Sequence, residues 1–298
     1  RRRHTRFRNV TGVQTCALPI YLEGDAPAQR SAWFREVCEH TATLLVHWMR
    51  VRFVHGVLNT DNMSILGQTL DYGPFGFMEA YDPAHICNHT DQQGRYAYHM
   101  QPRIGEWNCY ALGQAMVSLI GEVDEVHDAL SIYKPAFEAK LAALWQDKLG
   151  LSVAQPEDKL LVESLLDTMA RSRVDFPLFF RRLSSLQTDH PEADAPLRDL
   201  FIDCAAFDAW SVKYRARLRS ENSVDSVRRQ AMNKVNPKYM LRNYLAQQAI
   251  DKAQQKDFSE IRRLLHLLQK PFDEHNEHDS YAQLPPDWAS GIEVSCSS

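Results

Sequence analysis

Apolar residues at helical spacing run through most of this chain. Apolar residues at helical spacing predict a long buried helix over residues 31–53: Trp33, Phe34, Val37, Leu44, Leu45 and Trp48. The same pattern predicts further helices over residues 107–120, 125–149, 157–171, 175–187, 205–219, 223–234, 238–255 and 257–269. The predicted fold class is therefore α+β and predominantly α-helical.

The pattern changes between the first two predicted helices. Residues 63–70 read as two short strands around Gly67. Residues 71–105 are rich in Gly and Pro and have the character of an activation loop. Two later stretches, 188–197 and 271–286, combine Pro with polar residues and are expected to be flexible connections. The chain is thus expected to hold a catalytic part followed by a helical part.

Candidate chemistry lies at the two ends of the predicted hairpin. The string HGVLNTDN at residues 55–62 precedes it, and DYG at residues 71–73 follows it. In a kinase-like site, Asp61 would accept a proton, while Asn62 and Asp71 would offer oxygen ligands to Mg²⁺ on a nucleotide's phosphates. The alternative is that Asp61 and Asn62 form an Asx turn and Asp71 caps a loop.

Longer strings carry a family resemblance. They cover residues 55–62, 71–78 and 86–96, with shorter matches at Gln101–Pro102, Trp107–Asn108, Asn236–Pro237, Leu241–Asn243, Pro285–Trp288 and Glu293–Ser298. From about Tyr21 to its last residue, the chain resembles the selenoprotein O family, also called YdiU. The resemblance implies the C-lobe of a protein-kinase-like fold, long classed as a pseudokinase, with a helical C-terminal extension. It also implies transfer of AMP, or of UMP in some bacterial forms, to protein hydroxyl groups.

The resemblance assigns roles by position. Asp61 matches the family's proton acceptor, Asn62 and Asp71 match its metal ligands, and Asp71 also touches the nucleotide. The implied cofactor is Mg²⁺ or Mn²⁺, and ATP or UTP is the substrate. Cys296 lies where animal members carry their selenocysteine motif, so Cys87 and Cys296 are a possible redox pair. The alternative is that Cys87 is a small buried residue and Cys296 a stray exposed thiol.

The beginning of the chain departs from the family pattern. Residues 1–20 are rich in Arg and lack acidic residues, as a transit peptide would, yet they resemble translated sequencing-adapter DNA. They are interpreted as non-native. No glycine-rich loop or other counterpart of the family's N-lobe follows. The expected organisation is an adapter-like segment at 1–20, a kinase-like catalytic core with an activation-like loop at 21–122, and a helical region with a redox tail at 123–298. Alone, this fragment is expected to be inactive.

Composition is that of a globular protein: 298 residues, 44% hydrophobic and 24% charged. A formal net charge of −4 from 34 basic and 38 acidic residues gives no sign of a nucleic-acid surface. No stretch is long and apolar enough to span a membrane. Protein hydroxyl groups and a nucleotide are the expected partners, and a bacterial cytoplasm the expected location. Arg181–Arg182, Arg215–Arg219 and Arg228–Arg229 are expected to form solvated helix faces.

Several other interpretations were weighed. His85, Cys87 and His89 alternate as metal ligands can, but no second ligand pair completes a zinc site. Six scattered cysteines without a C-x-x-C spacing argue against a disulfide scaffold. A conventional protein kinase remains an alternative function, although the His-Arg-Asp string is missing and Asn62 follows Asp61 directly. A non-catalytic pseudokinase scaffold is the third possibility.

Overall fold

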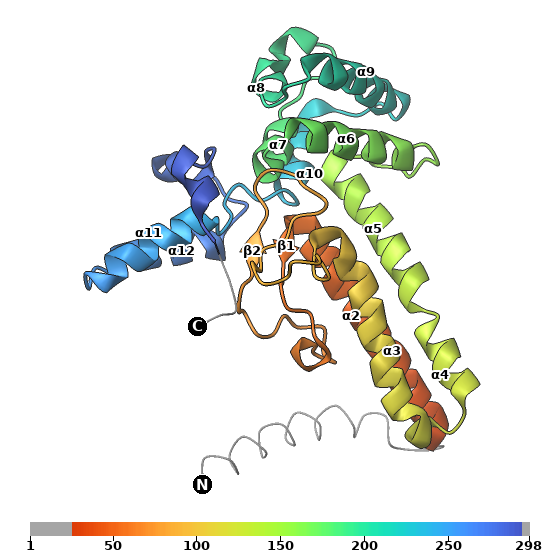
Figure 1. Ribbon diagram of the computed structural model, residues 1–298. Helices are drawn as coiled ribbons and strands as arrows, with labels where there is room; N and C mark the ends of the chain where they lie inside the picture. The colour runs from red at the N-terminus through yellow and green to blue at the C-terminus, as the bar shows by residue number, and fades with distance from the viewer. Residues whose placement is uncertain (1–25, 294–298) are drawn as a thin grey trace. The chain divides into compact units, whose positions relative to one another are not determined.

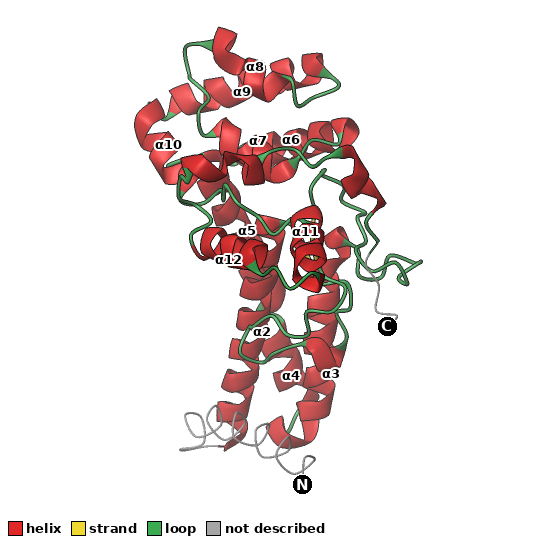
Figure 2. Ribbon diagram, turned by 90° about the vertical axis from the view of Figure 1, so that its left-hand side faces the viewer, coloured by secondary structure: helices red, strands yellow, loops and turns green. Residues whose placement is uncertain are grey.

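Helices dominate the computed structural model, which describes residues 26–293 (Figure 2). Two short strands, β1 (Phe53–Val54) and β2 (Gly76–Phe77), pair antiparallel with Phe53 opposite Phe77. These elements confirm the predicted α+β, mainly helical class, whereas the kinase-like C-lobe stays a prediction from the resemblance. The helices labelled in Figure 1 are α2 (Ala26–Val51), α3 (Gln101–Ile120), α4 (Val123–Leu130), α5 (Tyr133–Leu149), α6 (Asp158–Ser172), α7 (Phe176–Leu183), α8 (Ala195–Arg198), α9 (Cys204–Ser220), α10 (Asp225–Asn233), α11 (Asn243–Gln254) and α12 (Ser259–Gln269).

Most predicted helices are present, with two instructive differences. The helix predicted over residues 125–149 is interrupted and forms α4 and α5. The helix predicted over residues 238–255 begins only at Asn243. Arg242, the residue before α11, has an extended backbone with φ −70° and ψ 143°, so the helix does not continue through it toward residue 238. The backbone N–H groups of Lys238 and Tyr239 donate to the carbonyl oxygen of Pro271, at 2.8 and 3.1 Å.

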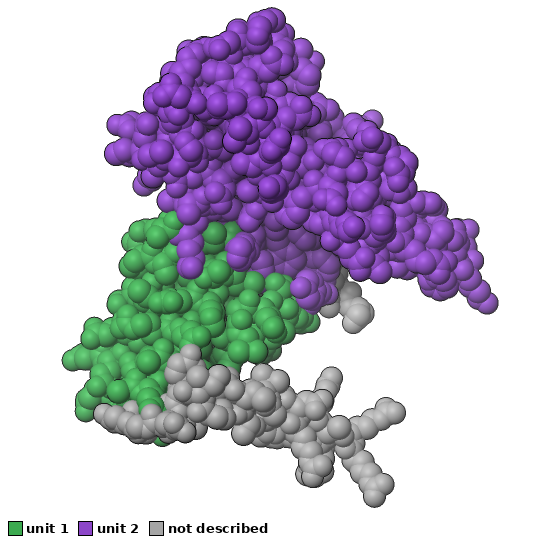
Figure 3. Space-filling model, turned by 180° about the vertical axis from the view of Figure 1, so that it is seen from behind, with its two compact units in different colours: residues 1–46, 58–71, 102–139 green, residues 47–57, 72–101, 140–298 purple. Residues whose placement is uncertain are grey.

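The chain divides into two compact units that interleave along the sequence (Figure 3). One contains residues 26–46, 58–71 and 102–139, and the other contains residues 47–57, 72–101 and 140 onward. The core of the first unit joins Phe34 and Cys38 of α2, Cys109 and Ile120 of α3, and Val126 of α4. The predicted domains meet at residue 122 and follow each other along the chain, whereas these two units interleave. The predicted division stays a prediction.

A larger core holds the second unit together. Buried residues of β1 and of the activation-like segment, such as Val54, Met78 and Tyr98, belong to one cluster with side chains of the later helices. In the same cluster, Trp210 of α9 donates its indole N–H to the carbonyl oxygen of Leu161 in α6, at 3.0 Å. The activation-like segment is therefore built onto the helical region rather than attached to it as a loose loop.

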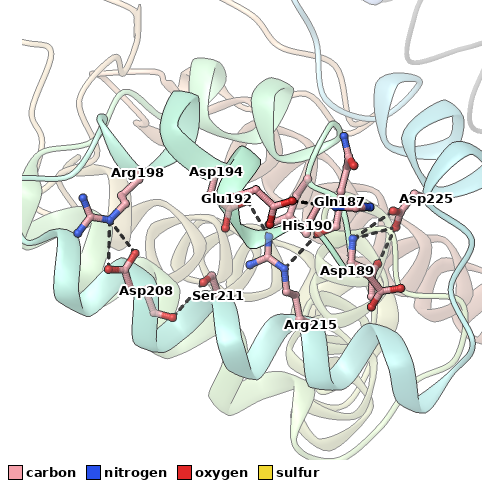
Figure 4. A network of polar contacts seen from close by, with 12 residues as sticks. Gln187, Asp189, His190, Glu192, Asp194, Arg198, Asp208, Ser211, Arg215 and Asp225 are labelled. Carbon is pink, nitrogen blue, oxygen red and sulfur yellow. Dashed lines mark hydrogen bonds and ion pairs between the residues drawn. The ribbon is translucent and has the colours of Figure 1, made fainter.

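Three arginines correct the expectation of solvated basic faces. Arg215, Arg217 and Arg228 are buried. Arg215 donates to Asp194 at 2.6 Å and to the carbonyl oxygen of Gln187 at 3.1 Å (Figure 4). Arg217 lies 2.6 Å from Asp158 and 2.8 Å from Glu221 in ion pairs. The expectation was wrong because Asp194 and Asp158 belong to elements other than α9, and a local pattern does not reveal such partners.

The stretch 188–197, expected to be a flexible connection, contains regular structure. A 3₁₀ turn, Pro191–Asp194, leads directly into α8. Arg215 fixes this turn through its ion pair with Asp194. Within residues 26–293, no helix combines the length and apolar character that crossing a membrane requires.

Candidate active site

The chain turns back around Gly67 as predicted, but the two short strands predicted over residues 63–70 are reduced to one isolated bridge. Met63 pairs with Thr69 through an antiparallel bridge, and the N–H of Gly67 donates to the carbonyl oxygen of Ser64 at 3.1 Å. Gly67 has a φ of 65°, a left-handed conformation that suits glycine in a tight turn. Just before the bridge, Thr60–Asn62 forms a 3₁₀ turn. The hairpin therefore starts and ends at the residues that carry the candidate chemistry.

One bridged pair lies close in the chain to the three candidate residues. Asn62, the last residue of the 3₁₀ turn, directly precedes Met63, and Asp71 follows Thr69 by two residues. Asp61 and Asp71 are exposed, and Asn62 is half-buried. Asp71 has a φ of 55°, a left-handed conformation that Asp tolerates better than most residues. The structure thus brings Asp61, Asn62 and Asp71 to one end of one hairpin, while their chemical roles stay predictions.

The donor atoms at this end of the hairpin fit a hard divalent cation. Asp71 offers a carboxylate and Asn62 an amide oxygen, and Mg²⁺ in nucleotide sites takes one or two such ligands together with phosphate oxygens and water. Between residues 26 and 293, no three His, Cys, Asp or Glu side chains gather as a metal site would need. The carboxylate of Asp71 and the amide oxygen of Asn62 therefore suit a cation shared with a nucleotide.

Buried amide side chains hold the backbone around the catalytic loop. Gln101 accepts from the N–H of His55 and donates to the carbonyl oxygen of Phe53, both at 2.9 Å. Asn108 donates to the carbonyl oxygen of Leu58 at 3.0 Å. Sequence reasoning saw Gln101 and Asn108 only as parts of matching strings.

Gly56 marks a close approach of backbone in the same segment. Its φ is 81°, and a Cβ there would lie 2.7 Å from the carbonyl oxygen of Pro74 and 2.8 Å from Sγ of Cys87. Asn88 donates to the carbonyl oxygen of Gly56 at 3.2 Å. Only glycine fits this position, so the strand leading to the catalytic loop packs tightly against the activation-like segment.

Cys87 is buried, with 9% of its surface exposed. Its Sγ lies 2.7 Å from the carbonyl oxygen of Pro74 and 3.3 Å from that of Val54, and burial raises the pKa of the thiol to about 12. Cys296 lies outside the described residues, so the redox pair stays a prediction. The carboxylate of Glu293 lies 4.0 Å from His89, which brings the end of the described chain close to this segment.

The segment after β2 is hydrogen-bonded to a stretch of chain that also holds a buried ion pair. Arg242 donates to both carboxylate oxygens of Asp175, at 2.6 and 3.1 Å. Asp175 also caps α7 by accepting from the N–H of Leu178 at 2.9 Å. Backbone hydrogen bonds run from Phe176 to Glu79 and from Tyr81 to Val174. This arrangement fixes the beginning of the activation-like segment.

Comparison with known proteins identifies the family. The family model described as "Protein adenylyltransferase SelO" matches residues 13–269. Proteins named "Protein nucleotidyltransferase YdiU" are similar: one from Herminiimonas arsenicoxydans is 60% identical over 90% of this chain and 53% of its own length. Another from Burkholderia multivorans is 52% identical over 92% of this chain and 55% of its own length.

The description of the family model and the names of the relatives both refer to enzymes that transfer nucleotides to proteins. The chain belongs to the SelO family, which confirms the predicted resemblance. It spans about half the length of the curated relatives that it matches.

Proposed function

We propose that the protein to which this chain belongs transfers AMP, or UMP, from a nucleoside triphosphate to Ser, Thr or Tyr hydroxyl groups of proteins. Membership of the SelO family and the names of the relatives support nucleotide transfer to protein. The observation that supports assigning the roles to individual residues is the bridge between Met63 and Thr69, because Asp61 and Asn62 come just before it in the chain and Asp71 just after it.

The proposed reaction is a displacement at the α-phosphorus of the nucleotide. The acceptor hydroxyl oxygen forms a bond to this phosphorus, the bond to the bridging oxygen breaks, and pyrophosphate leaves. Asp61 accepts the hydroxyl proton, since its exposed carboxylate can reach an incoming protein side chain. Asn62 and Asp71 would hold the divalent cation, Mg²⁺ or Mn²⁺, which neutralises charge on the phosphate oxygens when bound.

Placement is the main task of such a site, because phosphate chemistry requires little covalent work from the protein. The side-chain amide of Gln101 holds the backbone at the beginning of residues 55–58, and that of Asn108 holds it at the end, so this stretch keeps one conformation. The bridge between Met63 and Thr69 does the same for the hairpin. Asp61 and Asp71 therefore extend from a fixed backbone.

A labelling experiment tests the proposal. A full-length protein that contains this sequence is incubated with acceptor proteins and with ATP or UTP labelled at the α- or the γ-phosphate. Nucleotidyl transfer predicts label on protein from the α position only, and none from the Asp71→Ala variant. Label from the γ position would indicate a conventional protein kinase. Absence of label from every nucleotide would favour a scaffold.

We further propose that Cys87 and Cys296 form a regulatory disulfide. The approach of Glu293 to His89 supports this pairing, because Cys296 follows Glu293 by three residues and Cys87 precedes His89 by two. Since Cys87 is buried, the activation-like segment must open before the bond can form. Non-reducing peptide mapping of the oxidised full-length protein should yield a Cys87–Cys296 peptide. Its absence under oxidising conditions would exclude the switch.

A further inference from the structure

Helices α2 and α3 pack closely against each other within the first compact unit (Figure 1). A Cβ on Gly113 of α3 would lie 2.9 Å from Cζ of Phe34 in α2, and a Cβ on Gly105 would lie 3.2 Å from Cγ of Leu45. From the first contact to the second, residue numbers rise along α2 and fall along α3, so the two helices are antiparallel. Glycine at both contacts lets the helix backbones approach each other.

Two cysteines lie between these contacts. Cys38 follows Phe34 by four positions and Cys109 precedes Gly113 by four, so each lies about one helical turn from the same contact. Both thiols are free, and both side chains belong to the core of the first unit. A hydrogen bond between the two thiols lowers the pKa of Cys109 against the opposing effect of burial, and it raises the pKa of Cys38. Cys109 therefore loses its proton more readily than Cys38.

The packing of α2 on α3 suits a disulfide between these cysteines. Helix axes about 8–10 Å apart, with Cα atoms about 2.3 Å from each axis, leave directly facing Cα atoms roughly 3.4–5.4 Å apart. Disulfides join Cα atoms that are about 4.4–6.8 Å apart, so the two ranges overlap. Because Cys38 and Cys109 face each other in the antiparallel register, their sulfur atoms can bond with little movement of the helices.

The two thiols differ in their access to solvent. Cys109 lines a pocket of about 380 Å³ beside the hairpin and keeps 3% of its surface exposed, whereas Cys38 is fully buried. The pocket has room for molecules of the size of water, and hydrogen peroxide is only slightly larger. An oxidant of this size therefore meets Cys109 first, and the thiolate is the form of cysteine that reacts.

We propose that Cys109 and Cys38 form a redox-active pair, in which hydrogen peroxide oxidises Cys109 and Cys38 then completes a disulfide between α2 and α3. In the first step, the Cys109 thiolate attacks one peroxide oxygen, the O–O bond breaks, and a sulfenic acid and hydroxide form. In the second step, the sulfur of Cys38 attacks the sulfur of Cys109 and the S–O bond breaks. The proton of Cys38 leaves with the hydroxide as water. The reaction oxidises two thiols and reduces one peroxide.

Asn108 connects this pair to the catalytic loop. It directly precedes Cys109 in α3 and donates to the carbonyl oxygen of Leu58 at 3.0 Å. A disulfide draws the sulfur of Cys109 to about 2.05 Å from that of Cys38, which moves α3 at this hydrogen bond. Oxidation should therefore disturb the backbone that leads to Asp61.

Peptide mapping of a full-length protein that contains this sequence tests the pair. The folded protein is treated with hydrogen peroxide, free thiols are blocked, and tryptic peptides are analysed without reduction. We expect the peptide of residues 36–50 to be linked to that of residues 104–140, and dithiothreitol to separate them. Cys87 lies in a different peptide, residues 53–95, so the two proposed disulfides are distinguished. Absence of the 36–50 to 104–140 link would overturn the proposal.

Two substitutions test the order of the steps. Cys38→Ala should stop the reaction at the sulfenic acid of Cys109, which dimedone labels. Cys109→Ala should leave Cys38 without label, because Cys38 is fully buried and does not line the pocket. Label on Cys38 in the Cys109→Ala variant would contradict the assignment of Cys109 as the thiol that is oxidised first.

Two substitutions on α3 test the route of the oxidant. Ala115 lines the pocket and Gln114 does not, and both are exposed. Ala115→Phe should slow formation of the linked peptides about fivefold by filling the pocket, whereas Gln114→Phe should change the rate by less than about twofold, since exposure limits thiol oxidation. Equal rates in the two variants would contradict entry of the oxidant through the pocket.

A transfer assay tests the connection to the catalytic loop, and this part of the inference rests on the proposed function. In a Cys296→Ala background, peroxide should slow α-phosphate transfer at least about twofold, because misplacement of catalytic groups lowers the rate, and dithiothreitol should restore it. Additional Cys38→Ala should remove this recovery together with the linked peptides. An unchanged rate with the link present would contradict the connection through Asn108. No transfer in either redox state, with the link still formed, would refute the proposed function and leave the redox pair established.

Discussion

At the scale of single residues, Cys87 shows how burial changes the reactivity of a thiol. Because burial raises its pKa to about 12, Cys87 stays protonated far above the range in which ordinary cysteines ionise, around pH 8.5. We predict slow alkylation of Cys87 by iodoacetamide at pH 8, and fast alkylation of the more accessible Cys204. Peptide mass spectrometry over time measures both. Equal rates would show that the activation-like segment opens readily.

The buried Arg242–Asp175 pair should contribute strongly to stability. Arg242→Ala leaves the carboxylate of Asp175 buried without its partner, which typically costs about 3–5 kcal/mol in the free energy of unfolding. Arg198→Ala removes the exposed pair with Asp208 and should cost far less. Urea denaturation of the two variants gives the comparison. Similar losses in the free energy of unfolding would mean that the buried pair contributes no more to stability than the exposed pair.

At the residue scale, prediction from sequence failed where partners are distant along the chain. Asp61, Asn62 and Asp71 were singled out because they match a family motif, and their chemical roles stay predictions. Arg217 was expected on a solvated face, yet it pairs with Asp158 of another helix. Helical spacing places a residue on a face, but it does not say which charged side chains that face meets.

At the scale of elements, the segment that leads to the catalytic loop depends on Gly56. Gly56→Ala would bring a Cβ within 2.7 Å of a backbone oxygen in addition to the strain of a left-handed alanine. Gly94 also has a positive φ, but a Cβ there would meet its neighbours only at 3.8 Å or more. Gly94→Ala should therefore cost about 1–2 kcal/mol, and Gly56→Ala clearly more.

Thermal unfolding of the two glycine variants isolates the steric contribution, because both carry the same kind of backbone strain. A melting temperature lowered equally in both would show that the approach of Pro74 and Cys87 to Gly56 yields easily.

Elements with strong apolar spacing were predicted well, and their ends were not. The helix predicted over residues 31–53 corresponds to α2, because its buried face repeats over several turns. The predicted start at residue 238 was wrong, because the backbone of Arg242 is extended and α11 begins only at Asn243. Lys238 and Tyr239 donate to the carbonyl oxygen of Pro271 instead, and such tertiary backbone contacts have no local signature in the sequence.

At the scale of the whole molecule, the helical region shares its core with the activation-like segment. Val54, Met78 and Tyr98 belong to the same buried cluster as Leu165 and Trp210. We predict that residues 123–298, expressed alone, lack a unique packed core because this part of the cluster is missing. A near-ultraviolet circular dichroism spectrum without sharp aromatic bands would show this. A cooperative unfolding transition with native-like bands would instead support an independent domain beginning at residue 123.

The central claim is that Asp61, Asn62 and Asp71 act on one metal-bound nucleotide in different roles. Titration calorimetry with Mg²⁺–ATP on a full-length protein that contains this sequence, together with an α-phosphate transfer assay, tests it most directly. Because a carboxylate offers a full charge to the cation, Asp71→Ala should abolish both binding and transfer. Asp61→Ala should bind the nucleotide as tightly as the unsubstituted protein and transfer it at least about a hundredfold more slowly. Tight, metal-dependent binding by Asp71→Ala, or unimpaired transfer by Asp61→Ala, would contradict the account.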